Sequence, residues 1–348
     1  MKYIIAKHIG FLVDIDKRFR YIILLPIILN FNSALLAQDT RIRGFMDVGM
    51  NFEDDQLNFD LGEYDLFITS DLNDRLTFLG ETVFRYDLDV DAFEVSVERV
   101  VIKYNYKGNH SLLIGKHHTP INYWNDSYHH GRVFFPTVER PHLFQHSILP
   151  IHTTGISLQG QNLGKLRFGY DLMLGNGIGS TDLKDNDKFK SITAAVHIKP
   201  IDNMRIGASY YSDVISEGAQ IHGQLIDEQI NQQLFTASIA YFGRRFEVLA
   251  EGTLSVNKAS STGSVNSSAS YLYAGYRVNE KLVPYFRIDN LDFREEELYY
   301  DNRDTTAFVT GLRYEINYLA VVKLEYQYDH MGGMDSLNRL NFQIAIGF

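Results

Sequence analysis

The sequence predicts an all-β protein, a transmembrane antiparallel β-barrel of about sixteen strands. Three observations support this fold class. Apolar and polar residues alternate along most of the chain, short and long connections separate the alternating segments, and an export signal precedes them. Successive side chains of a strand point to opposite faces, so a barrel in a membrane needs an apolar outer face and a polar inner face. Single-chain bacterial barrels also require an even number of strands.

The first segment, residues 1–37, is typical of a secretory signal peptide. Basic residues between 17 and 20 precede an apolar run over 21–29, and small residues lead to Ala37. The run is too short to span a bilayer as a helix. We therefore expect cleavage after Ala37 and a single barrel domain over 38–348. Removing the five basic and two acidic residues of the signal leaves 28 Lys and Arg against 41 Asp and Glu, a formal charge of −13. This charge argues against nucleic acid as a partner.

The composition fits the same fold class. The chain has no cysteine, which excludes a disulfide framework and a thiolate nucleophile. It contains 22 tyrosines and 23 phenylalanines but one tryptophan, and barrels gather aromatic residues at both membrane interfaces. A soluble two-sheet sandwich would also alternate and enrich aromatics, but it does not predict an export signal.

Sixteen segments carry the strand pattern. We expect strands near 40–52, 58–71, 76–88, 92–106, 110–116, 154–161, 166–176, 190–199, 205–212, 233–242, 246–256, 268–276, 282–292, 305–316, 321–329 and 339–348. The last segment shows the pattern in full, because its apolar residues share one face: Leu340, Phe342, Ile344, Ile346 and Phe348.

The connections alternate in length. Tight turns such as 73–75 and 107–109 contain the Asn, Asp and Gly residues of hairpins. The longer connections include 117–153, 213–232, 257–267 and 293–304. Short periplasmic turns and long outer loops are the rule for these barrels. The Ser- and Asn-rich stretch 257–268 is expected to be a mobile outer loop.

One expected strand breaks the alternation. Glu94, Ser96 and Glu98 share one register, whereas Arg99 and Lys103 fall in the other. A charge facing lipid at mid-membrane costs roughly 2–4 kcal/mol. A β-bulge near Glu98 and Arg99 would turn all five side chains to the lumen.

The strand that ends at Phe348 resembles the C-terminal strand of Gram-negative outer-membrane barrels. The resemblance implies a location in that outer membrane, lipid around the barrel, and recognition of Phe348 by the barrel-assembly machinery. The strand count and the long third outer loop resemble sixteen-stranded porins, whose third loop folds into the lumen. The strand end at Gly115 and Lys116, which runs into an aromatic loop, is most similar to the phosphate-selective porins O and P. Porin resemblance implies passive diffusion of small polar or ionic solutes, homotrimers, no cofactor and no enzyme activity.

The connection over 116–153 is the expected constriction. It holds seven of the twelve histidines, the single tryptophan and four of the seven prolines. Its aromatic residues are expected to pack it against the barrel wall, and its prolines to stiffen it. Its candidate selectivity residues are Lys116, His117, His118, Trp124, Asp126, His129, His130, Arg132, Glu139 and Arg140. Basic side chains at a constriction favour anions.

The inward register of the strands carries charges of both signs. Those expected to face the lumen include Arg85, Arg99, Lys103, Arg167, Arg205, Arg313, Lys323, Glu81, Asp171 and Glu325. The phosphate-selective pattern implies a row of arginines, and this set departs from it. The solute therefore stays open between polar molecules in general and anions or phosphate.

The same loop admits other interpretations. The histidine pairs 117–118 and 129–130, with Asp126 between them, are possible transition-metal ligands, although adjacent residues rarely point to one centre. Ser127 with His129, or Asp126 with His130, would suit an enzyme site at the rim. A plugged barrel and an adhesin scaffold are further alternatives. No catalytic and no metal residue is predicted.

Overall fold

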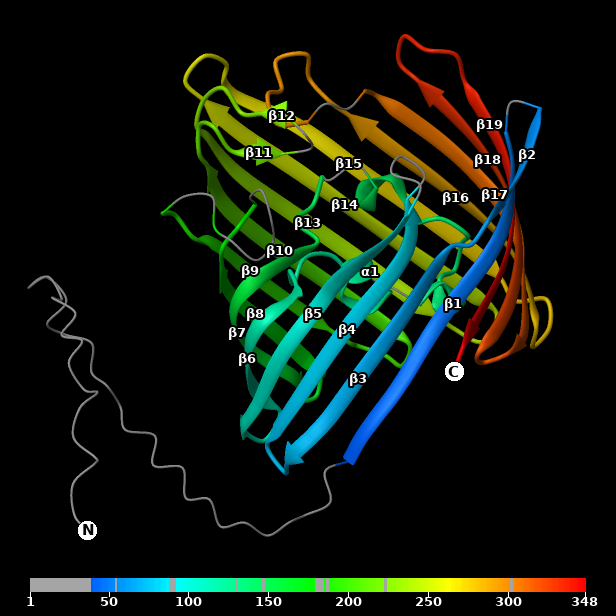
Figure 1. Cartoon of the computed structure of the whole chain (residues 1–348), viewed down its shortest axis with the longest axis horizontal. Coiled ribbons are helices and arrows are strands. Elements are labelled where there is room, and N and C mark those ends of the chain that lie inside the picture. The colour runs from blue at the N-terminus through cyan, green and yellow to red at the C-terminus, as the bar shows by residue number, and fades with distance from the viewer. Residues whose placement is uncertain are drawn as a thin grey trace, which may run out of the picture. The chain divides into compact units, whose positions relative to one another are not determined.

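The chain forms a closed antiparallel barrel of sixteen strands in a computed structural model (Figure 1). The structure describes residues 39–53, 55–87, 92–128, 131–145, 148–178, 185, 188–221, 224–300 and 303–348. Polar and apolar residues alternate along the strands as predicted, so large apolar side chains point outward and are exposed, among them Ile102, Leu172, Leu312, Leu324 and Leu340. This face is suited to lipid, whereas the inward side chains are mostly buried or polar.

The strands follow one another around the barrel. They are β1 (Asp39–Glu53), β2 (Gln56–Asp60), β3 (Glu63–Asn73), β4 (Leu76–Asp87), β5 (Ala92–Lys107), β6 (His110–His118), β7 (His152–Leu163), β8 (Phe168–Gly175), β9 (Ser191–Ile198), β10 (Met204–Ile215), β13 (Ile230–Phe242), β14 (Phe246–Ala259), β15 (Gly263–Tyr276), β16 (Leu282–Asp292), β17 (Thr305–Asn317), β18 (Ala320–Met331) and β19 (Leu337–Gly347). A two-stranded hairpin, β11 (Gln220–Ile221) and β12 (Gln224–Leu225), lies outside this sheet, between β10 and β13.

β2 and β3 together occupy one position in the barrel. β1 pairs with β2 through residues 49–53 and with β3 through residues 39–46. The interruption falls at Leu61 and Gly62, where Gly62 adopts a φ of 61° and a Cβ would overlap the carboxylate of Asp47. Only glycine adopts this backbone without strain. The 17-stranded sheet therefore has sixteen positions, and all sixteen predicted strands are confirmed.

The first and last strands close the barrel. β1 pairs with β19 from Phe45 opposite Gly347 to Glu53 opposite Arg339. Beyond that register, the backbones of Gly44 and Phe348 exchange two hydrogen bonds of 2.9 Å each. Closure leaves no open sheet edge between β1 and β19, which is the requirement for a sheet in lipid.

The predicted bulge is confirmed in β5. Glu81 of β4 lies opposite Arg99, and the next residue, Thr82, lies opposite Val97. Glu98 is therefore the extra residue, and its side chain is buried. The side chain of Glu81, which lies opposite Arg99, is also buried. The extra residue shifts the strand by one position and brings both Glu98 and Arg99 away from the apolar face.

The prediction of a mobile loop over 257–268 is wrong. β14 continues to Ala259 and β15 begins at Gly263, so the stretch is a strand pair with a tight turn. Cross-strand pairing decides strand formation more than composition does. Here Asn257 and Ser267 face the lumen and both donate hydrogen bonds to Glu297, at 2.8 and 3.1 Å.

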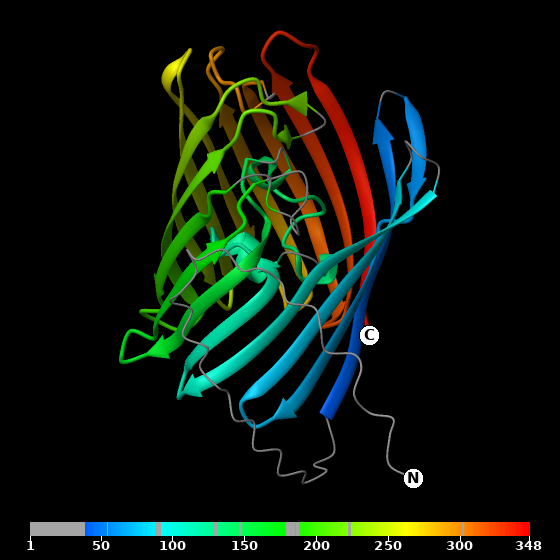
Figure 2. The ribbon, with the colours of Figure 1, turned by 60° about the vertical axis from the view of Figure 1, so that its left-hand side comes forward.

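Among the residues that the structure describes, the short helices lie in the connection between β6 and β7. They are α1 (Tyr123–Ser127), η1 (Arg132–Phe134) and η2 (His142–Phe144). Figure 2 shows this connection inside the ring of strands. In the part of the chain that the structure describes, no helix is long or apolar enough to cross a membrane.

Candidate functional site: a lumen divided by loop 3

The connection over residues 119–151, named loop 3 here, is the third outer connection and packs against one side of the barrel wall. Its aromatic core is centred on Trp124, which is buried. The Trp124 ring centroid lies 5.2 Å from that of Phe135, and 6.1 Å from those of Phe144 and the wall residue Tyr271. Aromatic pairs at these distances stabilise one another beyond the burial of their area. Loop 3 is thus fixed to the wall by a hydrophobic core inside the barrel.

Carboxylates of the wall accept hydrogen bonds from the backbone of loop 3. The pairs are Glu251 with the N–H groups of Tyr123 and Trp124, Asp65 with Gly131, Glu325 with Val138, and Asp289 with His142. The Trp124 and Val138 bonds are 2.9 Å long. These contacts satisfy backbone donors that are removed from water inside the barrel.

Cations of the wall donate to the carbonyl groups of the same loop. Lys323 Nζ lies 2.6 Å from the Arg132 carbonyl oxygen and 2.9 Å from that of Thr137. Arg287 Nη1 lies 2.8 Å from the carbonyl oxygen of Glu139, and Arg313 Nη1 lies 3.2 Å from that of Pro136.

The wall cations under loop 3 also pair with wall carboxylates. Arg313 makes two 2.8 Å bonds to Glu247, and Arg287 Nε lies 2.9 Å from Asp289. A buried charge is tolerated only where it is paired and hydrogen bonded. These charges therefore hold the loop in place and are not exposed to the lumen.

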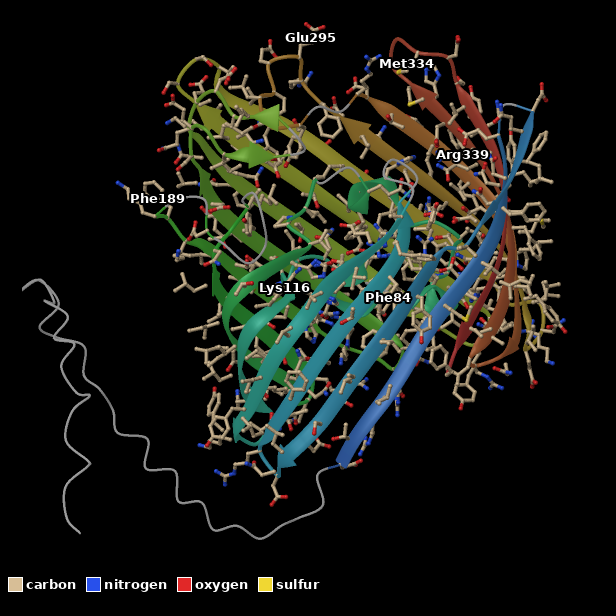
Figure 3. The ribbon with its side chains drawn as sticks, viewed as in Figure 1. Phe84, Lys116, Phe189, Glu295, Met334 and Arg339 are labelled. Atoms are coloured by element: carbon tan, nitrogen blue, oxygen red, sulfur yellow. The ribbon has the colours of Figure 1, made fainter. Side chains whose placement is uncertain are left out.

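The start of loop 3 is built from β6. Figure 3 labels Lys116 on this strand. Its Nζ donates a 2.8 Å hydrogen bond to the Val97 carbonyl oxygen, next to the bulge at Glu98. His117 is buried, and its Nδ1 lies 3.0 Å from the carbonyl oxygen of His118. The His118 ring lies 5.3 Å from that of His152. These three predicted constriction residues are bound into the wall at the point where loop 3 leaves it.

The middle of loop 3 holds the predicted ion pair. Arg132 Nη1 lies 3.2 Å from Glu139, and the guanidinium also lies 3.6 Å from both Asp47 and Glu63. The charge of Arg132 lowers the pKa of Glu139 below its ordinary value. The Arg140 guanidinium lies over the Phe135 ring at 5.9 Å. His129 and His130 lie outside the described residues.

The predicted lumen charges outside the wall of β7 to β10 fall into two groups. Arg313, Lys323 and Glu325 are buried beneath loop 3. On the other side of β1, Arg85 forms an ion pair with Glu63, and Arg99 with Glu81. Lys103 is half-buried in the inward register of β5, opposite Thr77.

The wall from β7 to β10, with β13, is built differently. Many of its inward side chains are small or uncharged, such as Gln159, Ala195, Gly207, Ser209 and Ser238, and the predicted lumen charges Asp171 and Arg205 lie among them. Loop 3 faces this wall through Pro120, Asn122 and Asp126, and the gap between them encloses about 30 Å³. We name this gap the narrow gap.

A larger cavity adjoins the narrow gap at the turn end of the lumen. It has a volume of about 480 Å³ and is named the basic cavity. Its charged and polar lining includes Arg167, Lys199, Arg205, His197, Asp126 and Asn203, and its apolar lining includes Tyr123, Tyr128, Ile201, Met204 and Phe242. Three cations therefore face one carboxylate of loop 3.

Arg205 connects the two sides of the basic cavity. Its Nη1 lies 2.6 Å from the Asp126 carboxylate, and its Nη2 lies 3.2 Å from Nδ1 of His197. Its guanidinium also lies over the Tyr123 ring, at 5.3 Å. These contacts hold α1 against β9 and β10.

The other two cations of the basic cavity lie at the strand turns. Arg167 lies 3.0 Å from the exposed carboxylate of Asp202. Lys199 Nζ donates to the Asn162 side chain at 3.1 Å. Sequence reasoning placed Arg167 and Arg205 in the inward register but did not single out His197 or Lys199. The inward register of His197 on β9 could have indicated its role. His197 lies opposite Gly207 of β10, the strand that also carries Arg205.

The structure does not bring the histidines of loop 3 into a metal centre in the part that it describes. No group of three or more His, Asp and Glu residues there could hold a metal ion. Asp126, which the metal and enzyme interpretations both used, is paired with Arg205.

Known proteins support the fold. No family model and no curated protein matches the sequence. Among solved structures, the in-vitro folded trimer form of OmpT, an outer membrane protein of Vibrio cholerae, is similar over 90% of this chain and 100% of its own, with a TM-score of 0.65 and 14% identity. An anion-selective porin from Comamonas acidovorans covers 89% of this chain and 100% of its own, with a TM-score of 0.64 and 12% identity.

A third similar structure is the outer membrane channel DcaP of Acinetobacter baumannii. It covers 89% of this chain and 97% of its own, with a TM-score of 0.63 and 12% identity. At these identities the likeness defines the fold, which is that of Gram-negative outer-membrane barrels.

Proposed function

We propose that this protein is an outer-membrane porin, a water-filled channel for passive diffusion of small polar solutes that favours anions. The observation that carries the proposal is the basic cavity beside the narrow gap, between loop 3 and the wall of β7 to β10 with β13. Solutes pass between α1 and the wall of β7 to β10. The likeness to structures described as a porin and as an outer membrane channel supports this proposal.

The preference for anions follows from which cations remain near the route. The loop cations Lys116, Arg132 and Arg140 are engaged with protein groups, and Lys323, Arg287 and Arg313 are buried under loop 3. Arg167, Lys199 and Arg205 line the basic cavity. Arg167 pairs with Asp202 and Arg205 with Asp126, whereas Lys199 donates to the uncharged Asn162, so one positive charge is in excess. An excess of positive charge in a confined aqueous space attracts anions.

Single-channel recording in planar bilayers tests the proposal. We expect steady conductance, and a reversal potential in a salt gradient that indicates anion selectivity. The double variant Arg167→Glu with Lys199→Glu should shift selectivity toward cations, whereas Arg244→Glu, in an exposed turn, should leave it near the wild-type value. A barrel that folds but carries no current would contradict the proposal.

Phosphate selectivity and trimer formation are finer parts of the proposal. The resemblance to phosphate-selective porins makes inorganic phosphate a candidate solute, which current block by phosphate would test. A trimer is supported by the trimer form of the similar Vibrio cholerae protein. Chemical cross-linking in detergent should then give a ladder that ends at three subunits.

We also propose that this barrel is not an enzyme. The Asp126 carboxylate, which the enzyme interpretation uses, is engaged by Arg205 and is not presented as a nucleophile. Hydrolytic turnover that disappears in Ser127→Ala would refute this.

A further inference from the structure

Two hydrogen-bond donors of the basic cavity lack an acceptor. His197 is buried, and its Nδ1 lies 3.2 Å from Nη2 of Arg205. A guanidinium nitrogen can only donate, so Nδ1 is the acceptor and the proton of the neutral ring lies on Nε2. His197 Nε2 and Arg205 Nε are both buried without a hydrogen-bond partner. A buried donor without an acceptor destabilises the fold, because the group loses its hydrogen bonds to water and gains none in return. Two such donors in one cavity therefore indicate a missing acceptor.

The backbone around His197 makes room for its ring. A Cβ at Gly169 of β8 would overlap the imidazole, so this position accepts the ring only as glycine. Gly207, on the neighbouring strand β10, lies opposite His197 and adds no side chain of its own. The position of the His197 ring therefore depends on glycine at residue 169.

The rest of the cavity defines the chemistry of the acceptor. Arg167 and Lys199 add positive charge, which selects an oxyanion over a neutral carbonyl. Ile201, Met204 and Phe242 contribute apolar surface at the same cavity. A volume of about 480 Å³ lies in the range of sites for small organic ligands.

We propose that the basic cavity is a saturable binding site for small organic anions. The oxyanion group accepts hydrogen bonds from Arg205 Nε and His197 Nε2, and the apolar body lies against Phe242 and Ile201. The proposal deepens the proposed function, on which it rests, by naming the solute class that the channel holds during passage. A carboxylate and a phosphate ester share the required chemistry.

Titration calorimetry of the refolded, full-length protein in detergent tests this site without requiring conduction. Benzoate and phenyl phosphate probe the two kinds of oxyanion on an apolar body, and acetate and inorganic phosphate lack that body. We expect at least one aromatic anion to bind about tenfold or more tightly than its small counterpart, because burial of its ring contributes roughly 1.4 kcal/mol or more. Equal affinity within both pairs would overturn the organic part of the proposal.

Three variants locate the site. Arg205→Gln removes one donor and a charge, and should weaken aromatic-anion binding about tenfold or more, since hydrogen bonds to charged groups are strong. Gly169→Ala displaces the His197 ring without changing any charge, and should also weaken binding. Arg244→Gln removes the same charge as Arg205→Gln from an exposed turn and should bind as wild type.

Heat-modifiable mobility on gels shows which variants are folded. Unchanged affinity in folded Arg205→Gln and Gly169→Ala would overturn the proposal. Normal conductance with no binding of any anion would overturn the binding site and leave the porin function standing. Binding that persists in a barrel without conductance would support the site and overturn the porin function.

Discussion

Lys116 shows how one residue compensates for an irregular strand. Val97, beside the bulge at Glu98, pairs with Thr82 of β4 but lies beyond the ladder of β5 with β6, which begins at Val100 opposite Lys116. Lys116 Nζ donates a 2.8 Å hydrogen bond to the Val97 carbonyl. A buried carbonyl without a partner would be unfavourable, so this lysine has a structural role that its charge alone does not suggest. Charged residues in a lumen are therefore not all selectivity residues.

Glu139 should make loop 3 sensitive to acid. Arg132 lowers the pKa of Glu139, so the ionised form is favoured in the folded protein. The stabilisation is present above the ordinary carboxyl pKa and is lost as the pH falls through the lowered folded value. We expect the unfolding temperature to fall between about pH 5 and pH 3 in the wild type, and to fall less in Glu139→Gln.

The measurement is thermal unfolding followed by gel mobility across that pH range. Glu296→Gln, which removes a carboxylate from an exposed outer loop, is the matched control and should follow the wild type. Parallel pH profiles for wild type and Glu139→Gln would show that the Arg132 pair does not contribute.

Individual contacts of the site were only partly predictable from the sequence. The inward register of Lys323 and Glu325 follows from strand periodicity, because alternation fixes the face of each residue. Their partners, the carbonyl of Thr137 and the N–H of Val138, lie nearly 190 residues away in the chain, at separations of 186 and 187. No local pattern encodes such a contact. His197 was missed for the same reason, since its role depends on a cavity shared by four strands and a loop.

α1 illustrates how a wall residue stabilises an element of loop 3. The helix has five residues, and its N-cap residue Asn122 makes no side-chain capping bond. A helix this short is unstable alone. Glu251 of β14 supplies the missing cap, because its carboxylate accepts the N–H groups of Tyr123 and Trp124. The negative charge at the helix N-terminus is also the favourable arrangement.

Removing the Glu251 carboxylate should therefore loosen loop 3. In Glu251→Ala two buried N–H groups lose their acceptor, which destabilises the protein by about 1–3 kcal/mol per group. We expect a lower unfolding temperature, and larger or noisier single-channel currents because α1 forms one side of the narrow gap. Glu251→Gln keeps one acceptor oxygen, so its unfolding temperature and current noise should lie between those of the wild type and of Glu251→Ala. Currents as steady as wild type in Glu251→Ala would show that α1 does not limit the route.

The elements differ in how far the sequence predicts them. Strands with a period of two were found at all sixteen positions, because lipid on one side and water on the other impose the alternation. The strand pair around 257–268 was missed because Ser and Asn are depleted in strands on average, although Glu297 and cross-strand partners stabilise them here. Tertiary contacts outweigh propensity at such positions.

At the scale of the whole molecule, Phe348 completes the closure of the barrel. Its backbone forms both hydrogen bonds to Gly44, and its ring stacks on Tyr64 at 6.0 Å. A Cβ at Gly44 would overlap the Phe348 ring, so the last residue fits a site that only glycine provides. The terminal residue thus has a structural role in addition to its expected recognition by the assembly machinery.

Two variants separate these roles of Phe348. Deletion of Phe348 removes both backbone bonds and should lower stability by about 2 kcal/mol. Phe348→Ala keeps the backbone bonds, so the purified protein should fold with a smaller loss of stability. Both variants should accumulate poorly in the outer membrane if the assembly machinery recognises the Phe348 ring. Refolding yield in detergent and the amount in isolated membranes measure the two effects. Normal membrane levels of Phe348→Ala would contradict the recognition role.

Deletion of loop 3 tests the division of the lumen. Replacing residues 121–149 with a short Gly-Ser linker leaves the strand pairing from β1 to β19 unchanged, since loop 3 takes no part in it. The wall charges that it covers would be solvated by entering water, so they would not be left unpaired in an apolar site. The barrel should therefore still fold, with a lower unfolding temperature because the aromatic core around Trp124 is lost.

The same deletion should raise single-channel conductance several-fold and weaken ion selectivity. The wider lumen would hold more electrolyte, and charges separated by more than a Debye length of about 10 Å at 0.1 M salt are screened. Arg167, Lys199 and Arg205 lie on the wall and its turns, so a residual preference for anions should remain. Shortening the outer turn over 332–336 is the control and should leave conductance unchanged. Unchanged conductance after deletion of loop 3 would show that the route does not pass beside it, and the narrow gap would then lose its role as the constriction.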